Sequence, residues 1–276
     1  MTNENPQFLN MPDGRKIAWL TNQAPNYTPP GILWVGGFKS NMTGIKASRI
    51  SEWAASQNLS CVRFDYSGHG ASSGQFEAGT IGEWTQECTA IFETVTTGPQ
   101  IIVGSSMGGW ITLLMTLAHI QQVGADNSRI KAIVLIAPAV DMTEDLMWQK
   151  FPEGIRKGLI ETGIFMRPSA YEDGAYPITL NLIEEGRKHL LFGDKKFNTH
   201  CPIHILHGKQ DADVPWQQSE KLIAHLANDD VKLELIKDGE HRLSRNEDIE
   251  RLIEAISECL PLEEKISLSA TKKTCK

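Results

Sequence analysis

Short apolar runs bounded by turn residues alternate along the chain with longer segments whose apolar residues recur at helical spacing. The short runs predict buried strands and the longer segments predict amphipathic helices. This alternation is typical of an α/β fold with a mostly parallel sheet covered by helices on both faces. A turn at 12–14 followed by the stretch 15–20 indicates a small edge hairpin, and 26–30 a loop. The predicted strands are 31–35, 60–65, 101–103, 130–137, 202–208 and 231–236, and the predicted helices are 45–58, 81–97, 110–115, 219–226 and 246–260.

The segment 141–199 breaks the alternation, because glycines and prolines interrupt its helical pieces. We interpret it as a helical lid inserted into the main domain. The alternative is an ordinary pair of helices packed on a face of the sheet. Residues 1–262 are predicted to form one domain and the polar tail 263–276 to be flexible. The apolar residues of the lid are Met142, Leu146, Met147, Trp148, Phe151, Phe165, Met166, Tyr171 and Tyr176.

The charge balance limits the partners that the chain can have. A net charge of −7 without a basic stripe argues against nucleic-acid binding. No apolar run approaches the length of a membrane span. The first residues show neither the basic nor the apolar region of a signal peptide, so the cytoplasm is the simplest location. A matrix-targeting segment removed earlier would leave no trace.

The five cysteines are odd in number and show no C-x-x-C spacing. This pattern favours reduced thiols over a disulfide framework or a zinc site. No carboxylate pair that matches a histidine pair is present, so neither a metal nor another cofactor is predicted. The cysteines are Cys61, Cys88, Cys201, Cys259 and Cys275.

The sequence IIVGSSMGG at 101–109 contains the pattern G-x-S-x-G around Ser106. A strand precedes the pattern and a helix follows it, which is the context that a nucleophilic serine on a sharp turn requires. The flanking glycines let the strand and helix approach each other. A chance glycine- and serine-rich turn is the alternative, and the context favours Ser106 as a nucleophile.

A serine hydroxyl needs a base, and eight histidines are candidates. His241 follows the last predicted strand in a glycine-containing loop, from which it can reach Ser106. His69 lies in the glycine-rich loop after an earlier strand and is the second choice. His119, His189 and His225 fall within helical stretches, and His204 and His207 belong to a strand. His241 is therefore the predicted base.

The acid that orients the base is expected between serine and histidine in the chain, the order typical of hydrolases with this turn. Asp211 and Asp213 both follow the strand that ends at 208. Either carboxylate would lie on a loop next to the one that bears His241. Asp141, after an earlier strand, is a further possible position for the acid.

The negatively charged intermediate of acyl transfer needs fixed N–H donors. The backbone N–H of Met107 directly follows the nucleophile at a helix start. The second donor is expected after the strand 31–35, where Gly36 and Gly37 precede Phe38, and Phe38 N–H is the predicted choice. The alternative is a simple turn.

Three segments together resemble the α/β-hydrolase superfamily: GSSMGGW, the loop at 64–74, and His-Gly-x-x-Asp-x-x-Val-Pro at 207–215. In that superfamily the first aspartate of the last motif is the triad acid, which corresponds to Asp211. GSSMGGW, CPIHILHGKQDADVPWQ and DGEHRLS more narrowly resemble the abhydrolase-domain palmitoyl-protein thioesterases that also cleave acyl glucuronides. The resemblance spans about residues 12 to 260. It departs at Gly36-Gly37, where many relatives carry His-Gly.

The resemblance implies an α/β-hydrolase fold and a serine hydrolase that works through an acyl-enzyme on S-palmitoyl thioesters or acyl glucuronides. The apolar lid residues favour a hydrophobic acyl group. Gly37, Trp148 and Phe165 are the predicted substrate-binding residues, and the partner is a small-molecule acyl substrate or an acylated protein. Two alternatives share the scaffold: a small-molecule receptor with a vestigial triad, and a cofactor-free haloperoxidase or C–C hydrolase.

Overall fold

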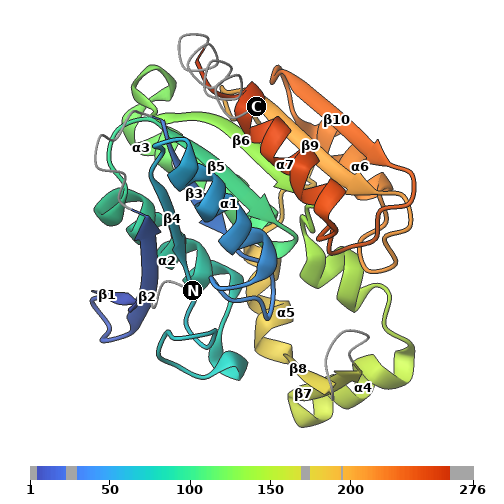
Figure 1. The fold of residues 1–276 in the computed structure, drawn as a ribbon. Coiled ribbons are helices and arrows are strands. Elements are labelled where there is room, and N and C mark those ends of the chain that lie inside the picture. The colour runs from blue at the N-terminus through green and yellow to red at the C-terminus, as the bar shows by residue number, and fades with distance from the viewer. Residues whose placement is uncertain (1–4, 23–29, 169–174, 194, 262–276) are drawn as a thin grey trace.

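An eight-stranded sheet runs through the centre of the computed structural model, which describes residues 5–22, 30–168, 175–193 and 195–261 (Figure 1). Its strands, in spatial order, are β1 (Gln7–Asn10), β2 (Lys16–Asn22), β4 (Cys61–Phe64), β3 (Gly31–Val35), β5 (Gln100–Ser105), β6 (Ile130–Ile136), β9 (Ile203–Gly208) and β10 (Val231–Ile236). The pairs β1–β2 and β2–β4 are antiparallel, and every other neighbouring pair is parallel. The predicted mostly parallel sheet with an edge hairpin is confirmed.

Helices cover both faces of the sheet because successive side chains of a strand point to opposite sides. In β3, Ile32 and Trp34 belong to one buried cluster, and Leu33 and Val35 to the other. The first cluster is covered by α1 (Ile45–Ser56) and α7 (Asn246–Glu258), and the second by α2 (Ile81–Val95), α3 (Met107–Val123) and α6 (Gln217–His225). The short elements η1 (Phe76–Ala78) and η2 (Ala125–Asn127) are single turns of 3₁₀ helix.

The predicted strands and helices of the main domain are present, with differences at their ends. The helix after the G-x-S-x-G pattern begins at Met107, directly behind Ser106, and continues to Val123. The earlier start places the helix N-terminus against the serine. Residues 26–29 of the predicted loop and the tail 263–276 lie outside the described residues.

The segment between β6 and β9 forms a group of elements that extends away from the sheet at the lower right of Figure 1. It contains an antiparallel pair of strands, whereas the sequence predicted helical pieces only. Pro168 and Pro177 obscured the strand pattern, and proline is tolerated here because both strands of a two-stranded sheet are edges. The elements are η3 (Thr143–Trp148, a π-helix), α4 (Glu153–Thr162), β7 (Ile164–Pro168), β8 (Ala175–Thr179), α5 (Leu180–Gly186) and η4 (Arg187–His189).

Hydrogen bonds join the two ends of this insertion to each other and its C-terminal end to the main domain. The Asp141 carboxylate accepts the backbone N–H groups of Leu191 and Phe192, each at 2.8 Å. The Trp110 indole donates to the carbonyl of His189 at 3.1 Å. Asp141, considered as an alternative acid, therefore closes the base of the insertion. That the insertion acts as a lid stays a prediction, and Tyr171 lies outside the described residues.

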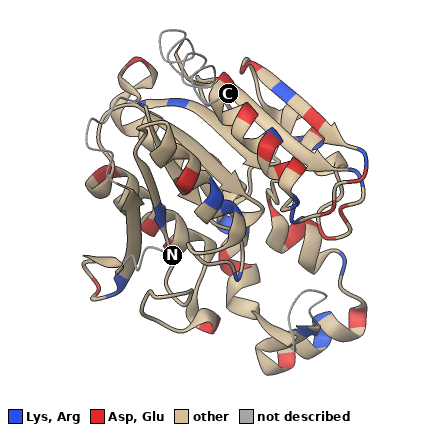
Figure 2. Cartoon of the chain, in the orientation of Figure 1, with Lys and Arg blue, Asp and Glu red and all other residues tan. Residues whose placement is uncertain are grey.

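The outer helix α7 carries exposed acidic side chains on its solvent side. Figure 2 shows Lys and Arg scattered among Asp and Glu in the described part of the chain, without a continuous basic stripe. That the chain does not bind nucleic acid stays a prediction. The exposed charged residues of α7 are Glu247, Glu250, Arg251, Glu254 and Glu258.

Candidate active site

Ser106 lies on the sharp turn between β5 and α3, with a backbone φ of +54°. This left-handed conformation is uncommon for a residue with a side chain, and the surrounding packing maintains it. A Cβ on Gly108 would lie 2.2 Å from the carbonyl oxygen of Val35, and one on Gly104 would lie 2.6 Å from the hydroxyl of Thr112. The glycine spacing of the pattern therefore follows from how closely strand, turn and helix pack.

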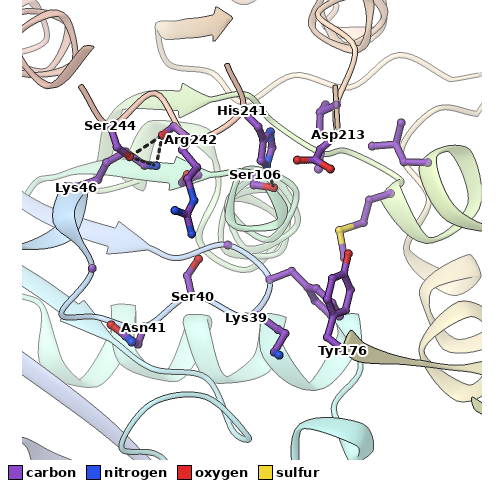
Figure 3. Close-up of a pocket in the computed structure, with 18 of the residues that line it drawn as sticks. Lys39, Ser40, Asn41, Lys46, Ser106, Tyr176, Asp213, His241, Arg242 and Ser244 are labelled. Atoms are coloured by element: carbon purple, nitrogen blue, oxygen red, sulfur yellow. Dashed lines mark hydrogen bonds between the residues drawn. The ribbon is translucent and has the colours of Figure 1, made fainter. Parts of the chain in front are cut away.

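Ser106, His241 and Asp211 form one row of hydrogen bonds. The Ser106 hydroxyl lies 3.0 Å from Nε2 of His241, and His241 Nδ1 lies 2.7 Å from Oδ2 of Asp211. An Nδ1–H that donates to the carboxylate leaves Nε2 as the acceptor for the serine proton. Figure 3 shows the imidazole directly beside Ser106. This is the geometry that lets a histidine take a proton from a serine.

Two glycines bring the acid loop and the histidine loop together. Gly208 ends β9 and Gly239 follows β10, and a Cβ on Gly208 would lie 2.3 Å from the Gly239 carbonyl oxygen. The same carbonyl accepts the N–H of Gln210 at 2.9 Å. The backbones of the two loops are thus in direct contact, which fixes the distance between Asp211 and His241.

Asp211 is buried, and both of its carboxylate oxygens accept hydrogen bonds. Its Oδ1 accepts the N–H groups of Asp213 at 2.9 Å and Val214 at 2.8 Å. Burial alone raises the pKa of this carboxyl, but hydrogen bonds from His207 and His241, with the charge of His241, lower it well below its usual range. Asp211 is therefore the ionised partner of His241, while Asp213 contributes its amide to Asp211.

His69, the second choice for the base, forms its hydrogen bonds with backbone groups away from Ser106. Its Nε2 accepts the N–H of Lys39 at 3.1 Å, and its Nδ1 lies 3.1 Å from the Ser67 carbonyl. Burial lowers the pKa of His69 to about 4, so the imidazole is neutral at pH 7. His69 therefore holds the loop after β3 and does not contact the serine.

The pKa of His69 predicts acid destabilisation. An unfolded histidine binds a proton at about pH 6.5, whereas folded His69 resists protonation down to about pH 4. The stability that the neutral ring supplies is complete above pH 6.5 and is lost as the pH falls towards 4, about 3 kcal/mol in all. Urea unfolding at pH 7 and pH 4.5 should show wild type losing about 2 kcal/mol more than His69→Gln, whose amide preserves both hydrogen bonds. Equal losses in the two proteins would contradict this assignment.

The two predicted oxyanion donors belong to two backbone segments next to Ser106. Met107 opens α3, where backbone N–H groups have no partner inside the helix. A Cβ on Gly37 would lie 3.2 Å from the Cβ of Ser106, so the loop that carries Phe38 passes next to the nucleophile. The Tyr66 hydroxyl donates to the Gly36 carbonyl at 3.2 Å and supports this loop. The positions suit an oxyanion hole, and the roles of Phe38 and Met107 stay predictions.

A cleft of about 630 Å³ opens around Ser106, within the usual size range of ligand pockets. One side is apolar and comes largely from the start of the insertion and from β8. The sequence predicted Trp148 and Phe165 as substrate-binding residues, but neither lines the cleft: Trp148 stacks with Arg187, and Phe165 packs on Phe151. Their rings stabilise the insertion itself. The apolar side is lined by Ala139, Met142, Leu146, Met147, Tyr176 and Val214.

The other side of the cleft is polar and cationic, which the sequence analysis missed. Figure 3 shows Arg242 and Lys46 on one side of Ser106, with Asp213 and Tyr176 on the other. Burial lowers the pKa of Lys46 to about 8. Among the lining residues that the structure describes, the cations of this side are Lys46 and Arg242, whereas Lys39 and Arg167 lie next to Tyr176 and Asp213 is acidic. The position of Arg242, directly after His241, is the signal that could have indicated this charge.

Asp211, Asp213 and His241 offer potential metal-ligand atoms within 4.8 Å of one another. Two of the three already share the short hydrogen bond of the row, with Asp211 accepting and His241 donating. That arrangement orients a proton-transfer group. The absence of a metal or other cofactor stays a prediction.

Known proteins with similar sequences and structures identify the family. The human palmitoyl-protein thioesterase ABHD10, mitochondrial, is 34% identical over 254 residues, covering 92% of this chain and 79% of that protein. This chain belongs to the α/β-hydrolase superfamily of serine hydrolases. The hydrolase is similar to a putative hydrolase from Agrobacterium vitis S4, with a TM-score of 0.86, 40% identity, and coverage of 94% and 99% of the two chains. It is also similar to mouse alpha/beta hydrolase domain-containing protein 10, with a TM-score of 0.80, 33% identity, and coverage of 92% and 97%.

The family assignment confirms the expected resemblance and the expected hydrolase class. Residues 32–166 match the family described as serine aminopeptidase, S33. The chain is thus a hydrolase of the esterase and thioesterase type. In its described part, no helix is both long and apolar enough to cross a bilayer. The ABHD10 relatives are named as mitochondrial, so they do not support the cytoplasmic location, which stays a prediction.

Proposed function

We propose that this hydrolase cleaves carboxylic esters or thioesters of a hydrophobic acyl group through an acyl-enzyme formed on Ser106. The observation that carries the proposal is the unbroken row from Ser106 Oγ through His241 to Asp211, opening into a cleft with an apolar side. A serine hydroxyl is a weak nucleophile, and this arrangement supplies both the base and the carboxylate that orients it.

In the proposed reaction, Ser106 Oγ attacks the acyl carbonyl while His241 Nε2 takes its proton. Asp211 stabilises the imidazolium, and the N–H groups of Met107 and Phe38 bind the oxyanion. The imidazolium then protonates the departing thiolate or alkoxide, which leaves the acyl group on Ser106. A water molecule, deprotonated by His241, attacks the acyl-enzyme; its collapse releases the acid and restores the serine.

The two sides of the cleft suit the two parts of such a substrate. The apolar side, with Met142 and Met147, accommodates the acyl chain. The cationic side, with Arg242, favours a leaving group that carries a carboxylate or phosphate. Of the two substrate classes that the resemblance implies, acyl glucuronides carry such a carboxylate in the leaving group itself. A small-molecule substrate of this type fits both sides, and an acylated protein fits if acidic groups flank its acylated cysteine.

A matched pair of thioesters tests this proposal. The S-acyl derivatives of N-acetylcysteine and of N-acetylcysteine amide share the acyl chain and thiol and differ in one carboxylate. We expect multiple turnovers of both, faster with medium or long acyl chains than with acetyl, and a kcat/KM about tenfold higher for the carboxylate, equivalent to one charge-assisted hydrogen bond. Arg242→Gln should remove the preference and retain turnover of the amide.

The control is Lys188→Gln, an exposed cation outside the cleft, which should leave the preference unchanged. Equal kcat/KM for carboxylate and amide would contradict the anionic leaving group while leaving the hydrolase in place. A single stoichiometric burst with every ester and thioester would instead indicate the receptor. Peroxide-dependent halogenation or C–C cleavage without ester turnover would indicate the third alternative.

A further inference from the structure

A second histidine touches the acid of the row. His207 lies on β9 and its side chain is fully buried. Its Nε2 lies 2.8 Å from the carbonyl oxygen of Val214 and 3.3 Å from Oδ2 of Asp211, and its Nδ1 lies 2.7 Å from the Ser219 hydroxyl. From the sequence His207 is predicted to be a strand residue, although it opens the His-Gly-x-x-Asp motif.

The neighbours of His207 determine where its proton resides. Nε2 faces a carbonyl and a carboxylate, which only accept, so Nε2 carries a hydrogen and donates. The Ser219 hydroxyl then donates to Nδ1. Oδ2 of Asp211 is therefore placed between two imidazole N–H groups, that of His241 at 2.7 Å and that of His207 at 3.3 Å.

We infer that His207 is a positioning residue that acts through Asp211 on His241. Its hydrogen bond to Val214 O fixes the turn 211–214. Its polar Nε2–H, with Nε2 3.3 Å from Asp211 Oδ2, favours the rotation of the carboxylate in which Oδ2 faces His241 Nδ1. The same N–H also attracts the negative charge on Oδ2, which limits how strongly Asp211 stabilises the protonated imidazole of His241. The inference rests on the proposed function, because it assumes that the row performs proton transfer.

The charged or titratable side chains in contact with Asp211 and His241 can be named. Among the described residues, His207 and Asp213 are grouped with them, and Lys46 and Arg242 line the same cleft but lie on the far side of His241 from Asp211 in the row. Ser219 on α6 and Val214 on the acid loop are neutral. A change at His207 should therefore be transmitted through Asp211.

The test replaces His207 with phenylalanine, which fills the space without a donor, and with glutamine, which supplies a donor and an acceptor. His207→Phe should lower kcat about ten- to hundredfold with little change in KM, because the Asp211 carboxylate is then free to rotate. The acid limb of its pH–rate profile should move to higher pH, because Asp211 then stabilises the protonated His241 more strongly. His207→Gln should recover most of both. The control is His204→Phe, another buried histidine of β9 that lies outside the row.

A measurement without turnover separates this inference from the proposed function. In folded protein, nitrogen-15 NMR should show His207 protonated at Nε2 and unprotonated at Nδ1. The low-field Nδ1–H proton of His241 should move further downfield in His207→Phe and stay in place in His204→Phe. Wild type that hydrolyses no ester, but shows these shifts, would contradict the function and retain the positioning. An unchanged His241 proton and acid limb in folded His207→Phe would overturn the inference.

Discussion

Ser106→Ala is expected to lower kcat for ester and thioester hydrolysis by about 10⁵-fold or more. Without Oγ, no acyl-enzyme forms, and His241 and Asp211 have no nucleophile to activate. The fold should remain intact, because the strained backbone of Ser106 is held by its neighbours: its N–H donates to Ile136 O and its carbonyl accepts from Gly109 and Ala139. Residual activity would then come from substrate binding and the oxyanion donors alone.

Labelling with a fluorophosphonate probe is the direct measurement, because the probe reacts only with an activated serine. Wild type should be labelled at Ser106, and Ser106→Ala should not be labelled at all. The matched control is Ser257→Ala on the outer helix α7. The Ser257 hydroxyl donates to the Ile253 carbonyl of the same helix. It should label and turn over like wild type. Labelling or full turnover in Ser106→Ala would show that another residue is the nucleophile.

Gly108→Ala is expected to destabilise the protein by about 3 kcal/mol and to lower activity sharply. The added Cβ would lie 2.2 Å from the carbonyl oxygen of Val35 and 2.4 Å from that of Gly36. Both atoms belong to the backbone of β3 and its loop, which cannot rotate away as a flexible side chain would. α3 must therefore move from the sheet, and Ser106 and the Gly37 loop move with it.

The comparison variant is Gly158→Ala, which adds a methyl group to a helix at a position with nothing within 4 Å. Alanine restricts the unfolded chain more than glycine does, so Gly158→Ala should be neutral or stabilising by up to about 1 kcal/mol. Urea unfolding and hydrolysis rates of both variants measure the contrast. Wild-type stability and activity in Gly108→Ala would mean that β3 and α3 are not in close contact at the turn that carries Ser106.

The elements of the main domain could be predicted from the sequence because their signals are local. The side chains of β3 are apolar at every position because they face helical layers on both sides, and that continuous apolar run is visible without the structure. The hairpin β7–β8 could not be predicted in this way, since Pro168 and Pro177 remove the strand signal at a place where only edge pairing makes proline tolerable. Trp148 and Phe165 were placed in the cleft on apolar character alone, which cannot tell packing within the insertion from contact with a substrate.

By itself, the sequence determined the α/β architecture, the turn that exposes Ser106, and a short set of candidate bases and acids, because strand and helix periodicity and glycine spacing are properties of neighbouring residues. The sequence also favoured His241 and, by resemblance, Asp211, but only the tertiary structure shows which candidates lie together. Gly208 against Gly239 sets the acid loop beside the histidine loop, which brings Asp211 to His241 and leaves His69 and Asp141 in other contacts. The cationic side of the cleft and the contact of His207 with Asp211 likewise join residues from separate loops and strands. Such contacts depend on how the elements pack, and no local pattern encodes that.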